Sequence, residues 1–371
     1  MSRSQAPLHI PSLDGIRAIS FLLVFLAHAG LEAWVPGGLG VTIFFFLSGF
    51  LITSLMREEM AETGGVSFKH FYLRRALRIL PPFYVVLLGA AALALVGILP
   101  GPPQSAPLLA QIFHFANYWT VLHGYEGEVA GTGVYWSLAV EEHFYLLFPA
   151  VFVLLHRILA TPRARAAFLW GVCALVLAWR CALVFGAGAP MNRTYLATDT
   201  RVDSILFGCA LALAGNPALD GEAPGRRALW LRALLPAGAA LMLVSLLFRD
   251  GRFRETFRYS LQGLALVPLF VCAVRNPRLR GVRLLNHPLL RRIGELSYSL
   301  YLLHHVVISG VQRWVPLPRV VQGAMALGLS FALSMAIWRW IEQPCARLRK
   351  RLTPRAAQPA PGLAVAVGGR S

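Results

Sequence analysis

The chain has 371 residues, of which 57% are hydrophobic and only 14% are charged, and its formal net charge is +18. This composition excludes an ordinary soluble protein, in which about a quarter of the residues are charged. A strongly basic soluble domain would suggest nucleic acid as a partner. Here the basic residues flank long apolar segments, which argues against nucleic acid and indicates membrane lipid as the surrounding medium.

Apolar segments long enough to cross a hydrocarbon layer of about 30 Å recur along the whole chain. They predict an all-α, polytopic integral membrane protein with about ten transmembrane helices. The expected spans are residues 17–34, 38–56, 78–99, 134–156, 167–186, 198–215, 229–248, 258–275, 293–313 and 319–340.

The basic residues also predict an orientation. With the N-terminus inside, the inside segments carry 24 Lys and Arg and the outside loops carry 7. By the positive-inside rule, both termini are then cytoplasmic. An alternative is that the first apolar run is a cleaved signal peptide, since Ala27-His28-Ala29 resembles a cleavage site. We disfavour it because cleavage there would remove the most informative charged pair in the chain.

The predicted outside connections between spans are short, with one exception. The loop from Pro100 to about Gly133 has no Lys or Arg, and it is a candidate for substrate contact or for a short re-entrant element. We expect residues 1–345 to form one membrane domain and residues 346–371 to form a disordered, basic cytoplasmic tail, because the tail is poor in large apolar residues. The five cysteines are single and lack a Cys-x-x-Cys pair, so neither a disulfide framework nor a zinc site is expected.

The first span contains three ionisable residues, Asp14, Arg17 and His28. Charges inside a bilayer are costly and are therefore functional candidates by default. The eleven-residue step from Arg17 to His28 turns about 1100° and rises about 16.5 Å, so both residues share one helical face. This predicts a protein-lined channel with a cationic mouth and a titratable base at its inner end. Asp14 can pair with Arg17 if the helix extends that far.

The fourth span brings an acidic group into the bilayer. It begins with Trp136-Ser137-Leu138 and continues to Glu141-Glu142-His143. If the span starts near Val134, Glu141 lies about 10 Å deep. We expect Glu141 either to form an interhelical salt bridge or to orient His28 for catalysis. A metal site is not expected, because the His-Glu-x-x-His pattern is absent.

Three arginines lie just before and at the start of the third expected span: Arg74, Arg75 and Arg78. Their spacing places them along one cationic edge at the cytoplasmic surface. Guanidinium groups bind phosphate bidentately, which suits the nucleotide end of coenzyme A. Positive-inside topology alone also places arginines at such edges.

Two later spans also contain polar residues. In the sixth span, Asp199 and Asp203 share a face and Arg201 is a candidate counter-ion for either one. In the ninth span, a stripe at i, i+4 and i+7 is a candidate substrate contact, or it holds helices together by hydrogen bonds. The stripe consists of Ser297, Tyr301 and His304.

Together these segments resemble the membrane-bound acyltransferase family 3, whose bacterial members are similar to O-antigen and exopolysaccharide O-acetyltransferases. The resemblance runs from Leu13 to about Pro344, and its segments occur in the family's order. They are Leu13-Asp14-Gly15-Ile16-Arg17 with His28, the run 44–52, Arg74-Arg75-Ala76-Leu77-Arg78-Ile79, Trp136-Ser137-Leu138 with Glu141, Arg201 with Asp203, Ser297-Tyr298 with His304, and Glu342 with Pro344.

The resemblance implies transfer of an acyl group, commonly acetyl from cytoplasmic acetyl-CoA, to a hydroxyl of a glycan or other cell-envelope acceptor in a bacterial-type inner membrane. The family's arginine–histidine pair falls on Arg17 and His28, and its loop arginines fall on Arg74, Arg75 and Arg78. Some members carry a C-terminal esterase-like domain, which we do not expect in this chain. The sequence leaves the oligomeric state open.

The expected mechanism assigns Arg17, Arg74, Arg75 and Arg78 to the coenzyme A phosphates, and His28 and Glu141 to catalysis. Asp203, Ser297, Tyr301 and His304 are assigned to the acceptor. His28 removes the acceptor's hydroxyl proton or briefly carries the acyl group. A rival from a different class is a transporter or flippase for glycans or lipid-linked intermediates that uses buried charges as a proton relay. A third possibility is a scaffold whose ion pairs only assemble helices.

Overall fold

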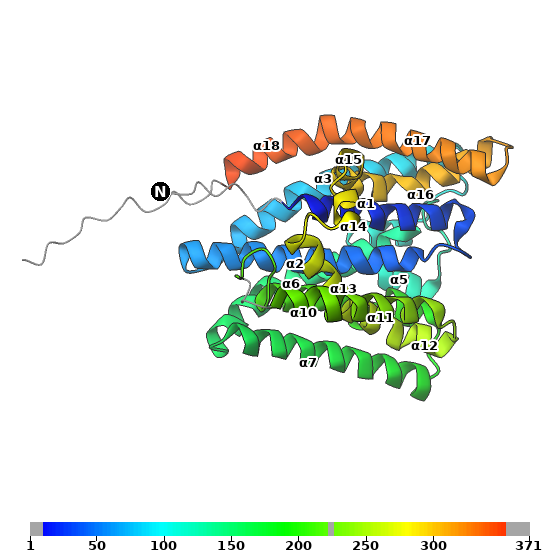
Figure 1. Ribbon diagram of the computed structural model, residues 1–371. Coiled ribbons are helices and arrows are strands. Elements are labelled where there is room, and N and C mark those ends of the chain that lie inside the picture. The colour runs from blue at the N-terminus through cyan, green and yellow to red at the C-terminus, as the bar shows by residue number, and fades with distance from the viewer. Residues whose placement is uncertain (1–9, 222–225, 354–371) are drawn as a thin grey trace, which may run out of the picture.

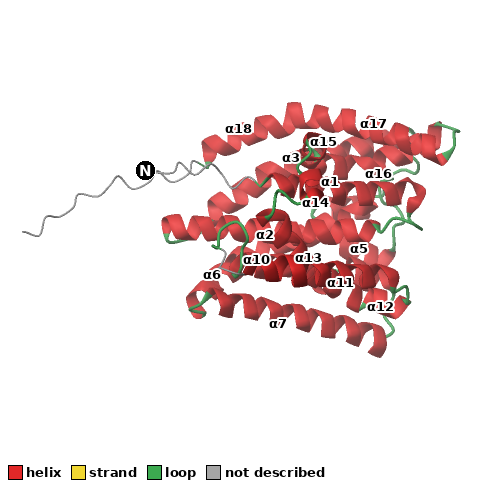
Figure 2. Ribbon diagram, viewed as in Figure 1, coloured by secondary structure: helices red, strands yellow, loops and turns green. Residues whose placement is uncertain are grey.

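The computed structural model describes residues 10–221 and 226–353. Within these ranges the protein consists of helices and connecting loops, with no strand (Figure 2). The long helices lie side by side along a common direction (Figure 1). They are α1 (Pro11–Leu26), α2 (Gly37–Thr63), α3 (Phe68–Leu95), α6 (Trp136–Ile158), α7 (Pro162–Cys181), α9 (Thr198–Leu213), α11 (Leu235–Leu247), α13 (Phe257–Arg275), α16 (Ser297–Trp314) and α17 (Arg319–Ile337).

Short helical segments connect or extend the long ones. The short α-helices are α4 (Ser105–Ile112), α5 (Ala116–His123), α8 (Met191–Leu196), α10 (Arg226–Leu229), α12 (Gly251–Glu255), α14 (Arg280–Leu285), α15 (Pro288–Glu295) and α18 (Gln343–Leu352). A 3₁₀ turn η2 (Gly133–Tyr135) precedes α6, and π turns are η1 (Ala27–Leu31), η3 (Ala182–Gly186), η4 (Trp230–Leu234) and η5 (Trp338–Glu342).

The prediction of an all-α membrane protein is confirmed, and each expected span overlaps one of the long helices. Eight helices in the described ranges are long and apolar enough to cross a membrane. The sixth and ninth expected spans, α9 and α16, are not among these eight. α9 has only 16 residues and α16 carries a polar stripe. The count of ten crossings and the cytoplasmic location of the termini therefore stay predictions.

Helix α9 forms the centre of the bundle. Nearly all of its residues are buried, and it packs against α2, α7 and α13. It crosses α2 at backbone contact, because a Cβ on Gly49 would lie 2.0 Å from the Ile205 carbonyl oxygen and one on Gly208 would lie 2.0 Å from that of Phe46. Small residues at helix crossings allow this close approach. This close crossing fixes the rotation of α2 and therefore decides which of its residues face the candidate active site.

Peripheral helices expose apolar side chains outward. Only 11% of the most apolar stretch of Arg227–Leu247 and 17% of that of Arg319–Leu352 are buried inside the protein. Such all-round apolar helices are expected to face lipid. The multi-pass membrane location follows from this pattern together with the lengths of the helices.

Two further regions bear on the predictions. The loop after Pro100 contains α4 and α5, and the expected substrate contact or re-entrant element there stays a prediction. Helix α18 continues to Leu352, so the predicted disorder does not hold for residues 346–352. A helix persists there because α18 packs against α3. The remainder of the expected tail, residues 354–371, lies outside the described residues.

Candidate active site

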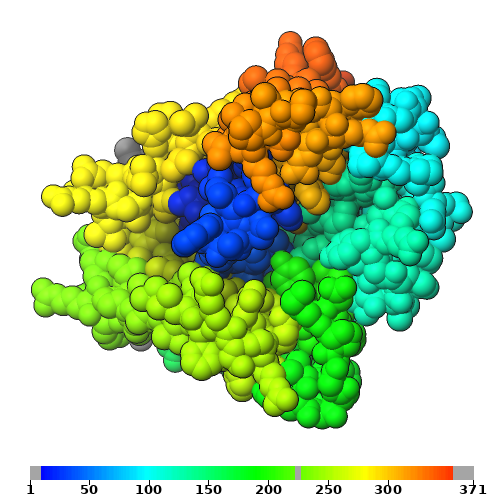
Figure 3. Space-filling view, turned by 90° about the vertical axis from the view of Figure 1, so that its right-hand side faces the viewer, coloured from blue at the N-terminus to red at the C-terminus, as the bar shows by residue number. Residues whose placement is uncertain are grey.

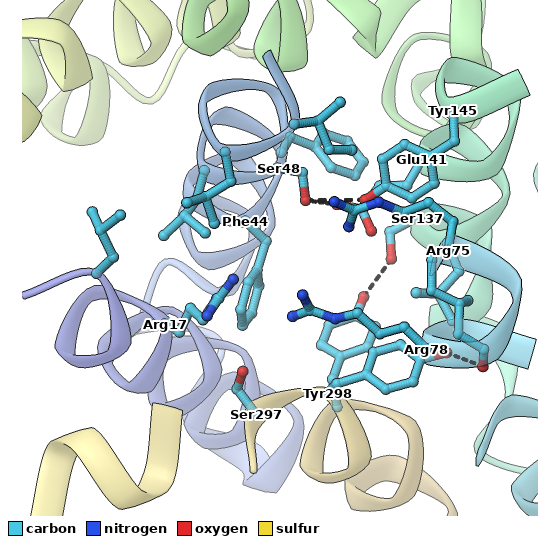
Figure 4. Close-up of a pocket in the computed structure, with 18 of the residues that line it drawn as sticks. Arg17, Phe44, Ser48, Arg75, Arg78, Ser137, Glu141, Tyr145, Ser297 and Tyr298 are labelled. Atoms are coloured by element: carbon cyan, nitrogen blue, oxygen red, sulfur yellow. Dashed lines mark hydrogen bonds between the residues drawn. The ribbon is translucent and has the colours of Figure 1, made fainter. Parts of the chain in front are cut away.

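A cavity at the predicted cytoplasmic half of the bundle has a volume of about 260 Å³. Its walls come from α1, α2, α3, α6 and α16, elements that are far apart in the sequence. Figure 4 shows the guanidinium groups of Arg17 and Arg78 pointing into it from opposite sides. Its polar lining residues are Asp14, Arg17, Ser48, Arg75, Arg78, Ser137, Glu141, Glu142, Tyr145, Ser297, Tyr298 and Tyr301. We call this space the inner cavity.

The three arginines of the inner cavity have different partners. Arg17 Nη1 donates to Asp14 at 3.2 Å, which confirms the predicted pair and shows that α1 begins early enough to include Asp14. Arg75 lies over the ring of Tyr145, 5.6 Å from its centroid. Arg78 is exposed and forms no ion pair with an acidic side chain in the described part of the chain. The inner cavity therefore holds cationic groups that an anionic ligand can reach.

Arg74 lies outside the inner cavity. Its Nη2 forms an ion pair with Glu59 Oε2 at 2.7 Å. Arg74 and Arg78 are four residues apart, but an acid from the end of α2 neutralises only the first of them. The predicted cationic edge is therefore split, and Arg75 and Arg78 are the members that face the cavity.

Glu141 accepts a hydrogen bond from Ser48 Oγ at 2.6 Å, and Ser48 in turn accepts from the Tyr145 hydroxyl at 3.3 Å (Figure 4). These bonds join α2 and α6 inside the inner cavity. The expectation that Glu141 orients His28 is wrong, because the hydrogen-bond partner of His28 is another residue. Residue spacing predicts how deep Glu141 and His28 lie in the bilayer. It does not predict how α6 is rotated about its own axis.

A second, larger cavity of about 1020 Å³ opens at the opposite end of the bundle. Figure 3 looks onto this end, where the connection from α1 to α2 lies near the middle of the face. Its polar and aromatic lining residues are His28, Glu32, Trp34, Tyr125, Glu128, Trp136, Tyr195, Ser245, Phe248, Arg249, Arg254, Arg258, Tyr259, Gln262, Tyr301 and His305. We call this space the outer cavity.

His28 lies where α1 changes into the π turn η1. Gly30 within this turn has φ +99°, a left-handed conformation that glycine adopts without steric cost. Single π turns inside helices occur frequently at functional sites. His28 lines the outer cavity, whereas Arg17 lines the inner one.

The hydrogen bonds of two histidines determine the tautomer of His28. His304 Nδ1 lies 2.7 Å from the carbonyl oxygen of Tyr301, which can only accept, so this nitrogen carries a proton. In the neutral ring, His304 Nε2 is then an acceptor, and it lies 3.1 Å from His28 Nδ1. His28 therefore donates from Nδ1. Its Nε2 keeps a free lone pair, as a base or a nucleophile requires.

The two cavities meet at Val41 and Tyr301, which line both of them. The Tyr301 hydroxyl lies 2.6 Å from Ser137 Oγ and donates to the Val134 carbonyl at 3.2 Å, so α16 is fixed to the start of α6 at this boundary. The predicted single channel from Arg17 to His28 corresponds in the structure to two cavities that both have Val41 and Tyr301 in their lining.

The remaining predicted substrate residues have different surroundings. Ser297 and Tyr301 line the inner cavity, whereas His304 is fully buried beneath His28. Asp203 lines neither cavity and is fully buried, accepting from Arg180 at 2.7 Å and Ser260 at 3.0 Å. It joins α7, α9 and α13, so its position favours a structural role over contact with an acceptor.

The expectation that Arg201 is a counter-ion for Asp199 or Asp203 is wrong. Asp199 pairs with Arg193 and Asp203 with Arg180. Arg201 is instead fully buried among aromatic rings, the nearest being Tyr259, with its centroid 4.0 Å away. Rings from four separate segments surround it, namely Phe45, Trp136, Tyr195 and Tyr259. Such cation–π contacts cannot be predicted from local spacing.

Sequence reasoning missed several residues of the site. His305 stacks on His28 with ring centroids 4.6 Å apart, and its adjacency to His304 was the available signal. Arg349 of α18 lies within electrostatic reach of Arg74 and Arg78. Glu128, in the loop before α6, accepts from Thr120 and Gln111, and burial raises its pKa to about 7. No local pattern marks Arg349 or Glu128.

No group of three or more His, Cys, Asp or Glu side chains suitable for a metal ion occurs in residues 10–221 and 226–353. The cluster of His28, His304 and His305 is instead connected by ring stacking and one hydrogen bond. Glu141 and Glu142 do not form a metal site with His143. The Nδ1 atom of His143 is instead hydrogen-bonded to the Thr198 hydroxyl.

Comparison with known sequences agrees with this geometry. Residues 10–339 match a family described as an acyltransferase domain. The chain belongs to this acyltransferase family. It is 29% identical over 359 residues to the O-acetyltransferase OatA of Staphylococcus aureus (strain NCTC 8325 / PS 47), covering 93% of this chain and 58% of that protein.

A second relative is the peptidoglycan O-acetyltransferase OatA of Listeria monocytogenes, 27% identical over 353 residues, with 91% of this chain and 56% of that protein covered. The chain therefore spans little more than half the length of these curated relatives. No solved structure matches it.

Proposed function

We propose that this protein is a membrane O-acyltransferase that moves an acyl group, most simply acetyl, from cytoplasmic acyl-CoA to a hydroxyl of a glycan or other cell-envelope acceptor. One observation carries the proposal: an arginine-lined cavity and a histidine-lined cavity meet at Tyr301. The family and its O-acetyltransferase relatives support it. We further propose a bacterial-type inner membrane as its location.

The inner cavity suits the donor. Arg17, Arg75 and Arg78 supply guanidinium groups for phosphate oxygens. A cavity of about 260 Å³ is too small for a whole nucleotide and its thioester arm. The arm therefore enters while the nucleotide stays at the mouth, where Arg78 is exposed and Arg349 lies nearby.

The outer cavity suits the acceptor and the chemical step. In direct transfer, His28 Nε2 removes the hydroxyl proton while the hydroxyl oxygen forms a bond to the thioester carbonyl carbon. The carbon–sulfur bond breaks, and the proton passes from His28 to the departing thiolate. In two-step transfer, the same nitrogen first bonds to the acyl carbon as the carbon–sulfur bond breaks and the thiolate leaves. The acceptor hydroxyl oxygen then bonds to that carbon, the carbon–nitrogen bond breaks, and the hydroxyl proton passes to the thiolate. Both routes require the acyl group to pass Tyr301.

The test uses the purified protein in lipid nanodiscs, which leave both faces accessible. Labelled acetyl-CoA is added with a mixture of soluble oligosaccharides, and both free thiol and labelled ester are measured. The proposal predicts equal amounts of thiol and ester, and esters that hydroxylamine releases. A transporter would leave acetyl-CoA unchanged, and that result with correctly folded protein would reject the enzymatic function.

A further inference from the structure

Arginines are concentrated in one segment on the predicted outer side. Residues 249–258 contain Arg249, Arg252, Arg254 and Arg258, which are four of the seven Lys and Arg in the expected outside loops. The positive-inside rule disfavours such a concentration on this side. Orientation signals therefore do not explain it, and a binding role becomes the better explanation.

Three of these four side chains line the outer cavity: Arg249, Arg254 and Arg258. Arg249 and Arg254 are exposed and form no hydrogen bond or ion pair through their side chains with any described residue. Arg252 does not line the cavity and lies instead over the ring of Phe185. The segment thus directs two unpaired guanidinium groups to the rim of the space that contains His28.

The segment is held in a defined shape. Asp250 begins α12, and its Oδ1 accepts from the backbone N–H of Phe253 at 2.8 Å. Arg258 Nη2 donates to the Tyr259 hydroxyl at 2.9 Å and lies 4.0 Å from Glu255. A fixed backbone presents the arginine side chains without a large ordering cost.

The acidic residues of the outer cavity do not cancel this charge. Glu32 and Glu128 are its acidic lining residues. Both carboxylate oxygens of Glu128 accept hydrogen bonds from the protein, one from Thr120 and one from Gln111. Its pKa is raised to about 7 by burial, which reduces its negative charge near neutral pH. The lining therefore keeps an excess of positive charge.

Aromatic rings line the same space. Trp136, Tyr195 and Tyr259 are buried or half-buried there, and Trp34 is exposed at the rim. Aromatic faces pack well against the C–H faces of sugar rings, and their polar edges donate hydrogen bonds. Rings together with free guanidinium groups are suited to a sugar that carries an anionic group.

We propose that the acceptor is an anionic glycan, whose carboxylate or phosphate group binds Arg249 and Arg254 while a sugar hydroxyl lies at His28. This inference rests on the proposed function and specifies its acceptor. Carboxylate and phosphate share the same guanidinium chemistry, so the experiment includes one acceptor of each kind. The side chain of Arg258 contributes through the wall it forms with Tyr259.

The experiment uses nanodiscs of zwitterionic lipid and three soluble oligosaccharides of equal length. One is neutral, one contains a uronic acid and one carries a phosphate monoester. We expect kcat/KM for at least one anionic acceptor to exceed that for the neutral one at least tenfold, with the preference shrinking as salt is added. Arg249→Gln and Arg254→Gln should each remove most of this preference while leaving the KM for acetyl-CoA unchanged.

Arg252→Gln is the matched control, because it removes the same charge from the same segment outside the cavity. It should keep the preference. Equal acetylation of all three acceptors would overturn the inference and leave the proposed function intact. Arginine effects seen only when anionic lipid is added would assign these residues to lipid headgroups, which also overturns it. Absence of transfer to every acceptor would reject the proposed function itself.

Discussion

The inner and outer cavities contain different chemical groups although they share a wall. The inner one is small, is formed by long helices and contains three guanidinium groups with two glutamates. The outer one is about four times larger, includes loop segments and contains histidines, aromatic rings and a separate set of arginines. Under the proposed function, the inner cavity would bind the constant donor and the outer cavity the variable acceptor.

This difference indicates where each kind of specificity resides. Long helices hold side chains rigidly, which suits a donor that is the same in every turnover. Loops vary more readily and often carry binding residues. We therefore expect substitutions in the inner cavity to change donor binding, and substitutions at the outer rim to change the choice of acceptor. Substitutions of the paired histidines should change the chemical step.

The largest effect is expected for His28→Ala, and this variant tests whether the chemical step takes place in the outer cavity. Loss of the base or nucleophile should reduce kcat about a thousandfold or more, while acetyl-CoA binding in the inner cavity is retained. Thiol release and a donor-binding titration on the nanodisc protein measure the two quantities. Full activity of His28→Ala would move the chemistry to another residue.

His304→Leu should lower kcat by about a hundredfold, because His28 then loses the acceptor that fixes its tautomer. His304→Gln keeps an acceptor oxygen and should recover a substantial part of the rate. Both variants should leave the KM for acetyl-CoA near the parent value. Equal losses in the two variants would indicate that His304 is needed only for packing.

Donor affinity should weaken about tenfold to a hundredfold in Arg75→Ala and Arg78→Ala, since a charged hydrogen bond contributes about 1.5–3 kcal/mol. The acceptor KM should not change. Arg74→Ala is the control, because Arg74 is paired with Glu59 outside the inner cavity. Binding calorimetry with acetyl-CoA measures the affinity. If Arg74→Ala lowers the affinity as much as Arg78→Ala does, Arg74 also belongs to the donor site.

The smallest expected effect concerns stability at the outer cavity. The pKa of Glu128 rises from the ordinary 4.5 to about 7 through burial. Between these values the folded protein binds more protons than the unfolded chain, so stability falls as pH rises through this range. Glu128→Gln should reduce the fall in Tm between pH 5 and pH 8, whereas the exposed Glu126→Gln should not. If the dependence of Tm on pH is the same in Glu128→Gln as in the parent protein, Glu128 is not the cause of the fall in Tm.

Part of the fold and site could be predicted because the relevant interactions are local. Helix periodicity and apolar length identified the long helices, and the three-residue spacing of Asp14 and Arg17 predicted their pair. The pairing of Asp203 with Arg180 could not be predicted, because the partner lies 23 residues away on another helix. The same holds for Arg201, whose rings come from four segments.

From the residues alone it follows that the chain lies in a membrane, that arginines gather near the predicted cytoplasmic side, and that His28 is an ionisable group within the first span. These properties depend on composition and on contacts within one helix. The packing of the helices was needed to show that His304 is the partner of His28, that Glu141 bonds to Ser48, and that Tyr301 lines both cavities. Such contacts depend on how each helix is rotated against its neighbours, which close crossings such as that of Gly49 and Gly208 determine.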